Sequence, residues 1–334
     1  MNMLWIDQPA GVGYSTCTGI KDCTFDDETS GKDNLAVILA WYEKYPEFKK
    51  NDLWLSGESY GGIYVPYMAY NIDEHNTAHR EDDSVFKPQL KGFAVGNGVT
   101  NWKYDTTPAF VDMGYWHSLY DTALYDKIQK AQCDFSGPFG TNITAECGGY
   151  LDEFNSFVSK VNVYDIFGVC YGLGPYPQLY GSQQKLDKTN SWSSADYTPW
   201  LKRGAASNEL PPCTWGTPLI SYLNNAEVKT NLHIPAEVQP WSLCTDQIHY
   251  AIQPKGSQWI YEALKGKYAM LHYSGDVDGA VPTIGTQNWI ADMGWDVDNK
   301  WSMYKVNGDV AGYTESYTGG LTFGTVHGAG HMAP

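Results

Sequence analysis

Apolar residues are spaced in two different ways along the chain. After Asp33 they recur at positions i, i+3, i+4 and i+7, which is the spacing of one helix face. The residues concerned are Leu35, Ile38, Leu39 and Tyr42. We therefore predict an amphipathic helix that Pro46 helps to end. Elsewhere the apolar residues form short unbroken runs, which are typical of buried strands.

The unbroken runs alternate with helical segments. We expect strands at Met3–Asp7, Asp52–Ser56, Leu90–Val95 and Tyr268–Tyr273, and helices at 62–75 and 283–293. This order predicts parallel pairing in a sheet that is covered on both faces. Three later alternating runs, at 302–306, 310–318 and 321–326, predict a small antiparallel meander.

The segment 101–240 follows neither pattern. It is rich in Tyr, Trp, Gly, Pro and Ser, contains four of the seven cysteines and has helical patches at Asp121–Ala131 and Leu151–Val161. We interpret it as a cap inserted over the carboxyl edge of the sheet. Residues 1–100 and 241–334 then form one α/β core. The aromatic residues of the cap either line a substrate pocket or pack against each other, and the sequence does not separate these roles.

Charge and composition narrow the class of protein. Of the 334 residues, 43% are hydrophobic, which is ample for a core, and the formal net charge is −16. Such an excess of acidic residues argues against nucleic acid or an anionic membrane surface as a partner. No apolar run reaches transmembrane length.

The cysteines indicate the compartment. Seven are many for a reduced cytosolic enzyme, and they lack the short paired spacings of a zinc site, so we expect no metal. Cys17 and Cys23 lie on one polar segment and can bridge to each other. Asn142 begins the glycosylation sequon Asn-Ile-Thr. Together these features favour an oxidising, secretory route.

The most informative stretch joins an apolar strand to a helix through Gly57-Glu58-Ser59-Tyr60-Gly61. Gly-x-Ser-x-Gly at such a junction is typical of a nucleophile elbow. The missing side chains of Gly57 and Gly61 let strand and helix approach closely, which holds Ser59 in a strained conformation and presents its hydroxyl. Because a free hydroxyl is inert near neutral pH, Ser59 needs a base.

An acid and a histidine follow Ser59 in the chain order of α/β-hydrolase triads. Of two aspartates in the loop after a late strand, we choose Asp278, because its loop turns back toward the site, whereas Asp276 is expected to cap the turn. In the last loop we choose His331 over His327, which lies nearer the strand end. The histidine would act as general base, and the aspartate would hold its tautomer and stabilise the imidazolium.

Two other patterns do not indicate a catalytic or cofactor-binding role. The Gly-Val-Gly at 11–13 lacks the third glycine and the following helix of a nucleotide-binding loop, so we expect no cofactor. The remaining six histidines have no such loop setting and are expected at the surface or in packing: His75, His79, His117, His233, His249 and His272.

Four blocks stand in order along the chain: WIDQPAGVGYS at 5–15, GESYGG at 57–62, YSGDVDGAVP at 273–282 and GAGHMAP at 328–334. They closely resemble blocks of the serine carboxypeptidases, relatives of cathepsin A and of the yeast vacuolar enzyme. The resemblance spans essentially the whole chain and is far more specific than the elbow, which many esterases and lipases share. It implies an α/β-hydrolase fold with a mostly parallel sheet and a large, mainly helical cap.

The resemblance also implies an activity. Single residues would be removed from the C-termini of peptides or proteins through an acyl-enzyme on Ser59, with Asp278 and His331 completing the triad. The main-chain N–H of Tyr60 would be one oxyanion donor. Substrate would be bound by Glu58, Gly57 and Met332, the last of these beside the leaving-group pocket.

Glu58 has two interpretations. In the family the glutamate before the nucleophile pairs with a second glutamate and helps to bind the terminal carboxylate of the substrate. Two adjacent carboxyls cannot both ionise cheaply, so one keeps a proton and can donate to an anion. We therefore predict an acidic pH optimum. Without the family, we would interpret Glu58 as a carboxylate stabilised by a helix dipole.

The chain also departs from the family. Members carry an upstream Asn-Gly-Gly-Pro-Gly-Cys segment with a second oxyanion amide, whose loss costs about 3 kcal/mol of transition-state stabilisation. We expect the 334 residues to be a fragment of a longer secretory enzyme, vacuolar, lysosomal or extracellular, without this segment and the C-terminal helix. The upstream cysteine would bridge to Cys244, which is then unpaired here. The implied pairs are Cys17 with Cys23, Cys133 with Cys147 and Cys170 with Cys213.

Two alternatives stay open. Plant relatives with the same scaffold are acyltransferases, in which a small alcohol attacks the acyl-enzyme in place of water, and their motifs overlap these. A truncated chain that keeps the triad could also be inactive. The sequence does not indicate the oligomeric state or the side chains preferred on either side of the cleaved bond.

Overall fold

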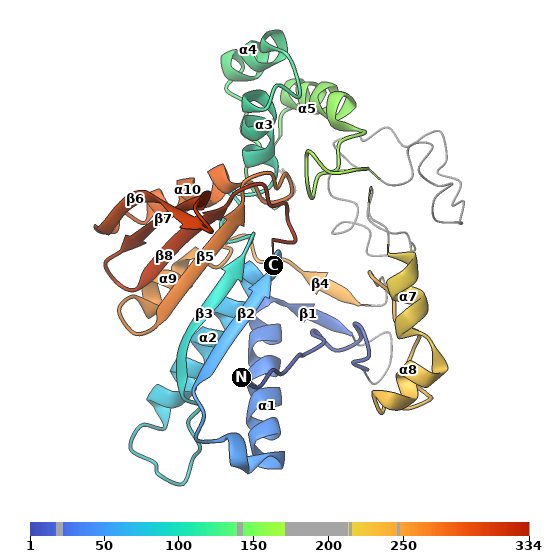
Figure 1. Ribbon diagram of the computed structural model, residues 1–334, viewed down its shortest axis with the longest axis vertical. Coiled ribbons are helices and arrows are strands. Elements are labelled where there is room, and N and C mark those ends of the chain that lie inside the picture. Colours follow the sequence, from blue (N-terminus) through green and yellow to red (C-terminus); the bar gives the residue numbers. More distant parts are fainter. Residues whose placement is uncertain (18–22, 139–142, 171–212, 214–215, 246–247, 334) are drawn as a thin grey trace.

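A six-stranded sheet lies at the centre of the computed structural model, which describes residues 1–17, 23–138, 143–170, 213, 216–245 and 248–333. The strand order is β2-β3-β5-β8-β7-β6 (Figure 1). Neighbours are parallel from β2 to β8, whereas β7 is antiparallel to both β8 and β6. The bounds are β2 Leu53–Glu58, β3 Leu90–Gly96, β5 Ala269–Gly275, β6 Val297–Val306, β7 Asp309–Tyr317 and β8 Leu321–Val326.

The antiparallel meander predicted near the end of the chain is present but not separate. Its last strand, β8, pairs in parallel with β5, so the meander extends the main sheet. The register places the carboxyl ends of the parallel strands at one edge, with Glu58 opposite Gly96, Gly96 opposite Tyr273, and Gly275 opposite Val326. Loops that leave these ends therefore meet at the same place.

The strand predicted at Met3–Asp7 is wrong. This apolar run has no strand partner among the described residues, and Trp5 is 78% exposed. The first strand is instead β1, Thr24–Asp26, which pairs in parallel with β4, His249–Ala251, in a separate two-stranded sheet. The loop after the apolar run is held by polar contacts, since Asp7 accepts a hydrogen bond from the Tyr14 N–H at 2.8 Å.

Helix α1 spans Asp27–Lys44 and begins six residues before the predicted start. Asp26 caps it, because its side chain accepts from the Thr29 N–H while the Thr29 hydroxyl accepts from the Asp26 N–H. The other helices are η2 Pro46–Phe48, α2 Gly61–Ala78, α3 Thr107–Trp116, α4 Thr122–Lys130, α5 Ala145–Val158, α7 Thr217–Leu223, α8 Ala226–Asn231, α9 Gln258–Leu264 and α10 Thr283–Asp292.

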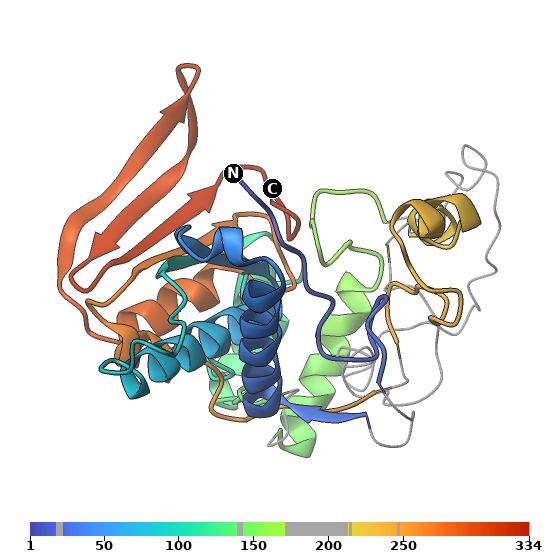
Figure 2. The same ribbon diagram turned by 90° about the horizontal axis from the view of Figure 1, so that it is seen from below.

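The helices cover one face of the sheet. Helices α2, α9 and α10 lie against it, with α1 packed on α2 (Figure 2). The core between them includes Ile63, Phe93, Tyr261 and Trp289. On the opposite face Trp54 is 58% exposed and Leu271 is 40% exposed. The prediction of a sheet covered on both faces is therefore wrong for the described residues.

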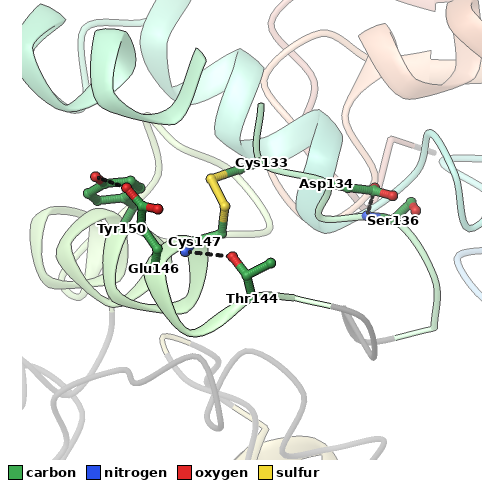
Figure 3. Close-up of a disulfide and its surroundings, with 7 residues drawn as sticks. All are labelled: Cys133, Asp134, Ser136, Thr144, Glu146, Cys147 and Tyr150. Atoms are coloured by element: carbon green, nitrogen blue, oxygen red, sulfur yellow. Dashed lines mark hydrogen bonds between the residues drawn. A yellow bond between two sulfur atoms is a disulfide. The ribbon is translucent and has the colours of Figure 1, made fainter. Parts of the chain in front are cut away.

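A second hydrophobic cluster lies among α3, α4 and α5. It is built around buried side chains such as Phe110, Leu124 and Phe154. The Cys133–Cys147 disulfide ties the end of α4 to α5, next to the Thr144 hydroxyl that caps α5 (Figure 3). No helix of the described residues is long and apolar enough to cross a membrane.

Three disulfides link the same cysteines as the family resemblance implies: Cys17 with Cys23, Cys133 with Cys147 and Cys170 with Cys213. Cys244 is a half-buried free thiol. The proposed glycosylation site Asn142 lies outside the described residues.

Candidate active site

Ser59 follows β2 directly and precedes α2. Its φ of 62° lies in the left-handed region, which costs a residue other than glycine about 1 kcal/mol. The Ser59 N–H donates to the Gly96 carbonyl at 3.0 Å, and the Ser59 carbonyl accepts from the Val99 N–H at 3.0 Å and the Gly62 N–H at 2.9 Å. The strained turn predicted for Ser59 is therefore present, and the end of β3 holds it from both sides.

Two glycines allow α2 to pack closely, Gly57 against β2 and Gly62 against the residues that follow β3. A Cβ on Gly57 would lie 2.8 Å from Cγ2 of Val65, and one on Gly62 would lie 2.3 Å from the Val99 carbonyl oxygen. A Cβ on Gly61 would meet no atom within 4 Å. The packing role predicted for Gly61 is wrong, whereas Gly62 allows the helix to approach the residues that follow β3.

Asp278 and His331 form a buried pair at the carboxyl edge of the sheet. The His331 Nδ1 lies 2.8 Å from the Asp278 Oδ2, and their side chains are 3% and 0% exposed. Asp278 also accepts from the N–H of Ala280 at 2.8 Å and of Val281 at 3.2 Å. Because the carboxylate can only accept, Nδ1 carries a proton in this contact. The tautomer with Nε2 free to accept is the one that a general base needs.

The main chain of His331 is anchored on both sides. Its N–H donates to the Tyr164 carbonyl at 2.6 Å, and its carbonyl accepts from the Asn97 Nδ2 at 2.6 Å. Its Nε2 is buried and has no hydrogen-bond partner among the described residues, Ser59 included. Contacts between a serine and its base often tighten only when substrate binds.

Glu58 lies close enough to this pair for their charges to interact. Burial raises the pKa of Glu58 above its usual range, the Asp278 carboxylate adds to this, and His331 opposes it. Burial by itself lowers the pKa of His331, but the charges of Asp278 and Glu58 outweigh it, so the pKa of His331 is raised. The protonation states of Glu58 and His331 are therefore coupled.

Tyr60, the residue after Ser59, is fixed by its side chain. Its hydroxyl donates to Oδ1 of Asp27 at 2.8 Å, and the Tyr250 hydroxyl donates to the same oxygen at 2.9 Å. Asp27 is 1% exposed and begins α1. The Tyr60 N–H has no acceptor among the described residues, so it is available to an oxygen of a substrate.

The pair that the sequence argument rejected also exists. The His327 Nδ1 lies 2.7 Å from the Asp276 Oδ2, and the Gly328 N–H donates to the Asp276 Oδ1 at 2.7 Å. The side chains are 67% and 31% exposed for His327 and Asp276. Asp276 therefore ties the two loops together at the surface. The expectation that it caps the turn of its own loop is wrong, because both of its side-chain partners lie in the loop after β8.

The other predicted residues are spread around this edge. Met332 follows His331 and is 74% exposed, and Gly57 lies in β2 against α2. Among the six histidines set aside, His272 is fully buried in β5, where burial lowers its pKa to about 3. No three His, Cys, Asp or Glu side chains of the described residues are grouped so that they could hold a metal ion.

Two residues that hold His331 were not identified from the sequence. Asn97 lies in the Gly-Asn-Gly that ends β3 and has a φ of 42°. Such a glycine-flanked asparagine is a sequence pattern that could have indicated a left-handed turn at this position. Tyr164 lies in the segment interpreted as a cap, and no local pattern indicates its contact with a residue so distant in the sequence.

Comparison with known proteins extends this picture to the whole chain. The sequence model of the family "Serine carboxypeptidase" matches residues 1–334. Serine carboxypeptidase 1 of Hordeum vulgare is 29% identical over 99% of this chain and 70% of the relative. Serine carboxypeptidase ctsa-4.1 of Caenorhabditis elegans is 31% identical over 100% of this chain and 71% of its own. Serine carboxypeptidase-like 21 of Arabidopsis thaliana is 31% identical over 100% of this chain and 72% of the relative.

A solved structure shares the fold. The crystal structure of a prohormone-processing carboxypeptidase from Saccharomyces cerevisiae matches with a TM-score of 0.67 at 19% identity, over 98% of this chain and 69% of that one. The fold is that of the α/β-hydrolases, with a mostly parallel central sheet. With the family match over its full length, the chain belongs to the serine carboxypeptidase family of hydrolases.

Proposed function

We propose that this chain releases C-terminal residues from peptides through an acyl-enzyme on Ser59, with His331 as the base and Asp278 as its partner. The observation that carries the proposal is the buried Asp278–His331 pair, whose Nδ1 is occupied while Nε2 has no partner among the described residues. It lies at the sheet edge where Ser59 occupies a strained turn. Membership of the family supports the same assignment.

The proposed reaction has two halves. The Ser59 hydroxyl attacks the last peptide carbonyl while His331 Nε2 takes its proton, and Asp278 stabilises the imidazolium. The proton then passes to the leaving amine, which departs as the C-terminal residue. Water attacks the ester in the same way, and the peptide is released shortened by one residue. The Tyr60 N–H would donate to the oxyanion in both halves.

Glu58 would link this reaction to acidic pH. Its raised pKa favours a neutral carboxyl in mildly acidic solution, and a neutral carboxyl can donate a hydrogen bond to the terminal carboxylate of the substrate. Protonation of Glu58 also removes one of the charges that raise the pKa of His331, so the base stays neutral further into the acid range. As pH rises, Glu58 ionises and repels the substrate carboxylate.

We also propose that residues 101–240 cap the sheet edge that carries the site. Two contacts support this: the Tyr164 carbonyl accepts from the His331 N–H, and the Val163 carbonyl accepts from the Gly279 N–H at 2.8 Å. Two of the three disulfides lie in this region. Disulfides favour an oxidising compartment, so we propose a secretory destination, vacuolar, lysosomal or extracellular.

Mass spectrometry of a peptide with an apolar C-terminus, incubated near pH 5, tests the proposed function. We expect the wild-type chain to remove one residue at a time and the Ser59→Ala variant to leave the peptide intact. A peptide left unchanged by the wild type would contradict the peptidase activity. If Ser59 nevertheless reacts with a fluorophosphonate and the chain consumes glycosyl esters, acyl transfer is the better assignment.

A further inference from the structure

Asn97 joins the three segments that carry Ser59, Asp278 and His331. It follows β3 with a φ of 42°, and it is fully buried. Its N–H donates to the Tyr273 carbonyl at 2.8 Å, so it continues the pairing of β3 with β5. Asparagine tolerates this left-handed conformation better than most residues because its short amide can hydrogen-bond locally.

The side chain of Asn97 uses both ends of its amide. Its Oδ1 accepts from the Gly275 N–H at 2.8 Å, at the start of the loop that leads to Asp278. Its Nδ2 donates to the His331 carbonyl at 2.6 Å and to the Gly330 carbonyl at 3.2 Å. Because Gly275 offers an N–H donor and Gly330 and His331 offer two carbonyl acceptors, the network fixes the orientation of the amide.

The flanking main chain holds Ser59. The Gly96 carbonyl accepts from the Ser59 N–H, and the Val99 N–H donates to the Ser59 carbonyl, each at 3.0 Å. The main chain of the four residues 96–99 therefore contacts the Ser59 turn. One side chain of the same segment, that of Asn97, contacts the loops of Asp278 and His331.

We propose that Asn97 is a positioning residue that sets the place of His331 relative to Ser59. The contact with Asp278 fixes the ring through Nδ1, but the position of Nε2 also depends on where the main chain of His331 lies. Asn97 connects that main chain to the same strand end that holds Ser59. The inference rests on the proposed role of His331 as the base for Ser59, and it does not depend on which acyl acceptor follows.

Two substitutions separate this role from packing. Asn97→Gly suits the left-handed backbone and removes only the side chain. Asn97→Asp keeps an oxygen for the Gly275 N–H. Once ionised, at alkaline pH, it turns a second oxygen toward the two carbonyls and so selectively breaks the contact with His331. Asn307→Gly is the matched control, because Asn307 has a φ of 54° in the exposed turn between β6 and β7.

The measurement is the rate constant with which a fluorophosphonate labels Ser59 in the full chain. A rate constant reports on folded molecules, whereas an unfolded fraction lowers only the final extent of labelling. We expect Asn97→Gly and Asn97→Asp to slow labelling by about 10- to 100-fold, since displacing a reacting group by about 1 Å has effects of this size. Asn307→Gly should label within about twofold of the wild type, as expected of a surface change.

Each outcome decides the matter. Equal rate constants in Asn97→Gly and the wild type, or a loss of extent alone, would show that Asn97 only supports the fold. A normal rate in Asn97→Asp at alkaline pH, where the aspartate is ionised, together with a slow rate in Asn97→Gly would assign the effect to Gly275 and overturn the role through His331. If the wild type is labelled but cleaves no peptide, the proposed function fails and the inference stands. If the wild type is not labelled, both fail.

Discussion

Two Asp–His pairs connect the loop after β5 to the loop after β8, and their surroundings differ. The N–O distances are almost equal, 2.8 Å for Asp278–His331 and 2.7 Å for Asp276–His327. The first pair is at most 3% exposed, whereas His327 in the second is 67% exposed. A contact of this length is worth little in water and much more where water is excluded. Burial, and not geometry, separates a candidate catalytic pair from a surface tie.

The partners of the two carboxylates differ in the same way. Asp278 receives two further N–H groups from its own loop, so its charge is held in place beside the ring. Asp276 receives the Gly328 N–H from the opposite loop, so it fastens one loop to the other. The exposed pair therefore shapes the loops, while the buried pair has the setting that proton transfer requires.

The largest expected effect comes from changing the two aspartates in parallel. Asp278→Asn should lower kcat for peptide cleavage by about 10⁴-fold, because an amide favours the wrong imidazole tautomer and cannot stabilise the imidazolium. Asp276→Asn should stay within about threefold, because an exposed pair contributes less than about 1 kcal/mol. Steady-state kinetics of both variants measure this difference. A fall of similar size in both would contradict the distinction by burial.

The described residues also contain a fully buried aspartate that has no hydrogen bond to a histidine. Asp105 is fully buried and accepts from the N–H groups of Thr100 and Asn101, yet burial raises its pKa to about 7. The native state then holds a proton that the unfolded chain releases at lower pH. The stabilisation that this bound proton on Asp105 gives is complete below about pH 4 and is lost as pH rises to about 7.

We therefore expect Asp105→Asn to remove part of this pH dependence. Relative to the wild type, the free energy of unfolding of the variant should rise by about 3 kcal/mol between about pH 4 and about pH 7. Urea unfolding at both pH values, with disulfides intact, measures it. A difference between the variant and the wild type that stays constant over this interval would contradict the raised pKa.

A smaller effect is expected at Glu58, whose charge interacts with the buried Asp278–His331 pair. Glu58→Gln mimics the protonated form at every pH, so the loss of kcat/KM between about pH 5 and about pH 8 should shrink by about tenfold, the effect of one pKa unit. The acid limb should also move to lower pH, because ionised Glu58 no longer raises the pKa of His331. A pH profile of the variant that superimposes on that of the wild type would exclude Glu58 from the pH response.

Local patterns in the sequence were enough for part of the site. Gly-x-Ser-x-Gly between an apolar strand and a helix predicted the turn at Ser59, and chain order with loop position led to Asp278 and His331. These features are encoded within a few residues, so they can be identified before any long-range contact is known. The choice between the two aspartates is one that burial supports and that kinetics has yet to test.

The errors arose where distant residues decide the structure. The first turns of α1 bury Asp27, Ser30 and Gly31. Apolar spacing does not indicate these residues, because none of them is apolar and their partners lie in α2 and near β4. The apolar run at Met3–Asp7 is exposed, and β1 pairs with a strand that comes much later in the chain. Asn97 was not identified from the sequence, since its partners come from β5 and from the end of the chain.

The smallest effect is expected when the exposed pair loses its histidine. His327→Ala removes the contact with Asp276 Oδ2 but leaves the Gly328 N–H on Oδ1, and the His331 main chain stays anchored by Asn97 and Tyr164. Steady-state kcat should therefore remain within about twofold of the wild type, as for other exposed pairs, whereas His331→Ala should abolish cleavage. If His327→Ala instead lowered kcat more than tenfold, the surface tie would have to hold His331 in place, and burial would no longer be what separates the two pairs.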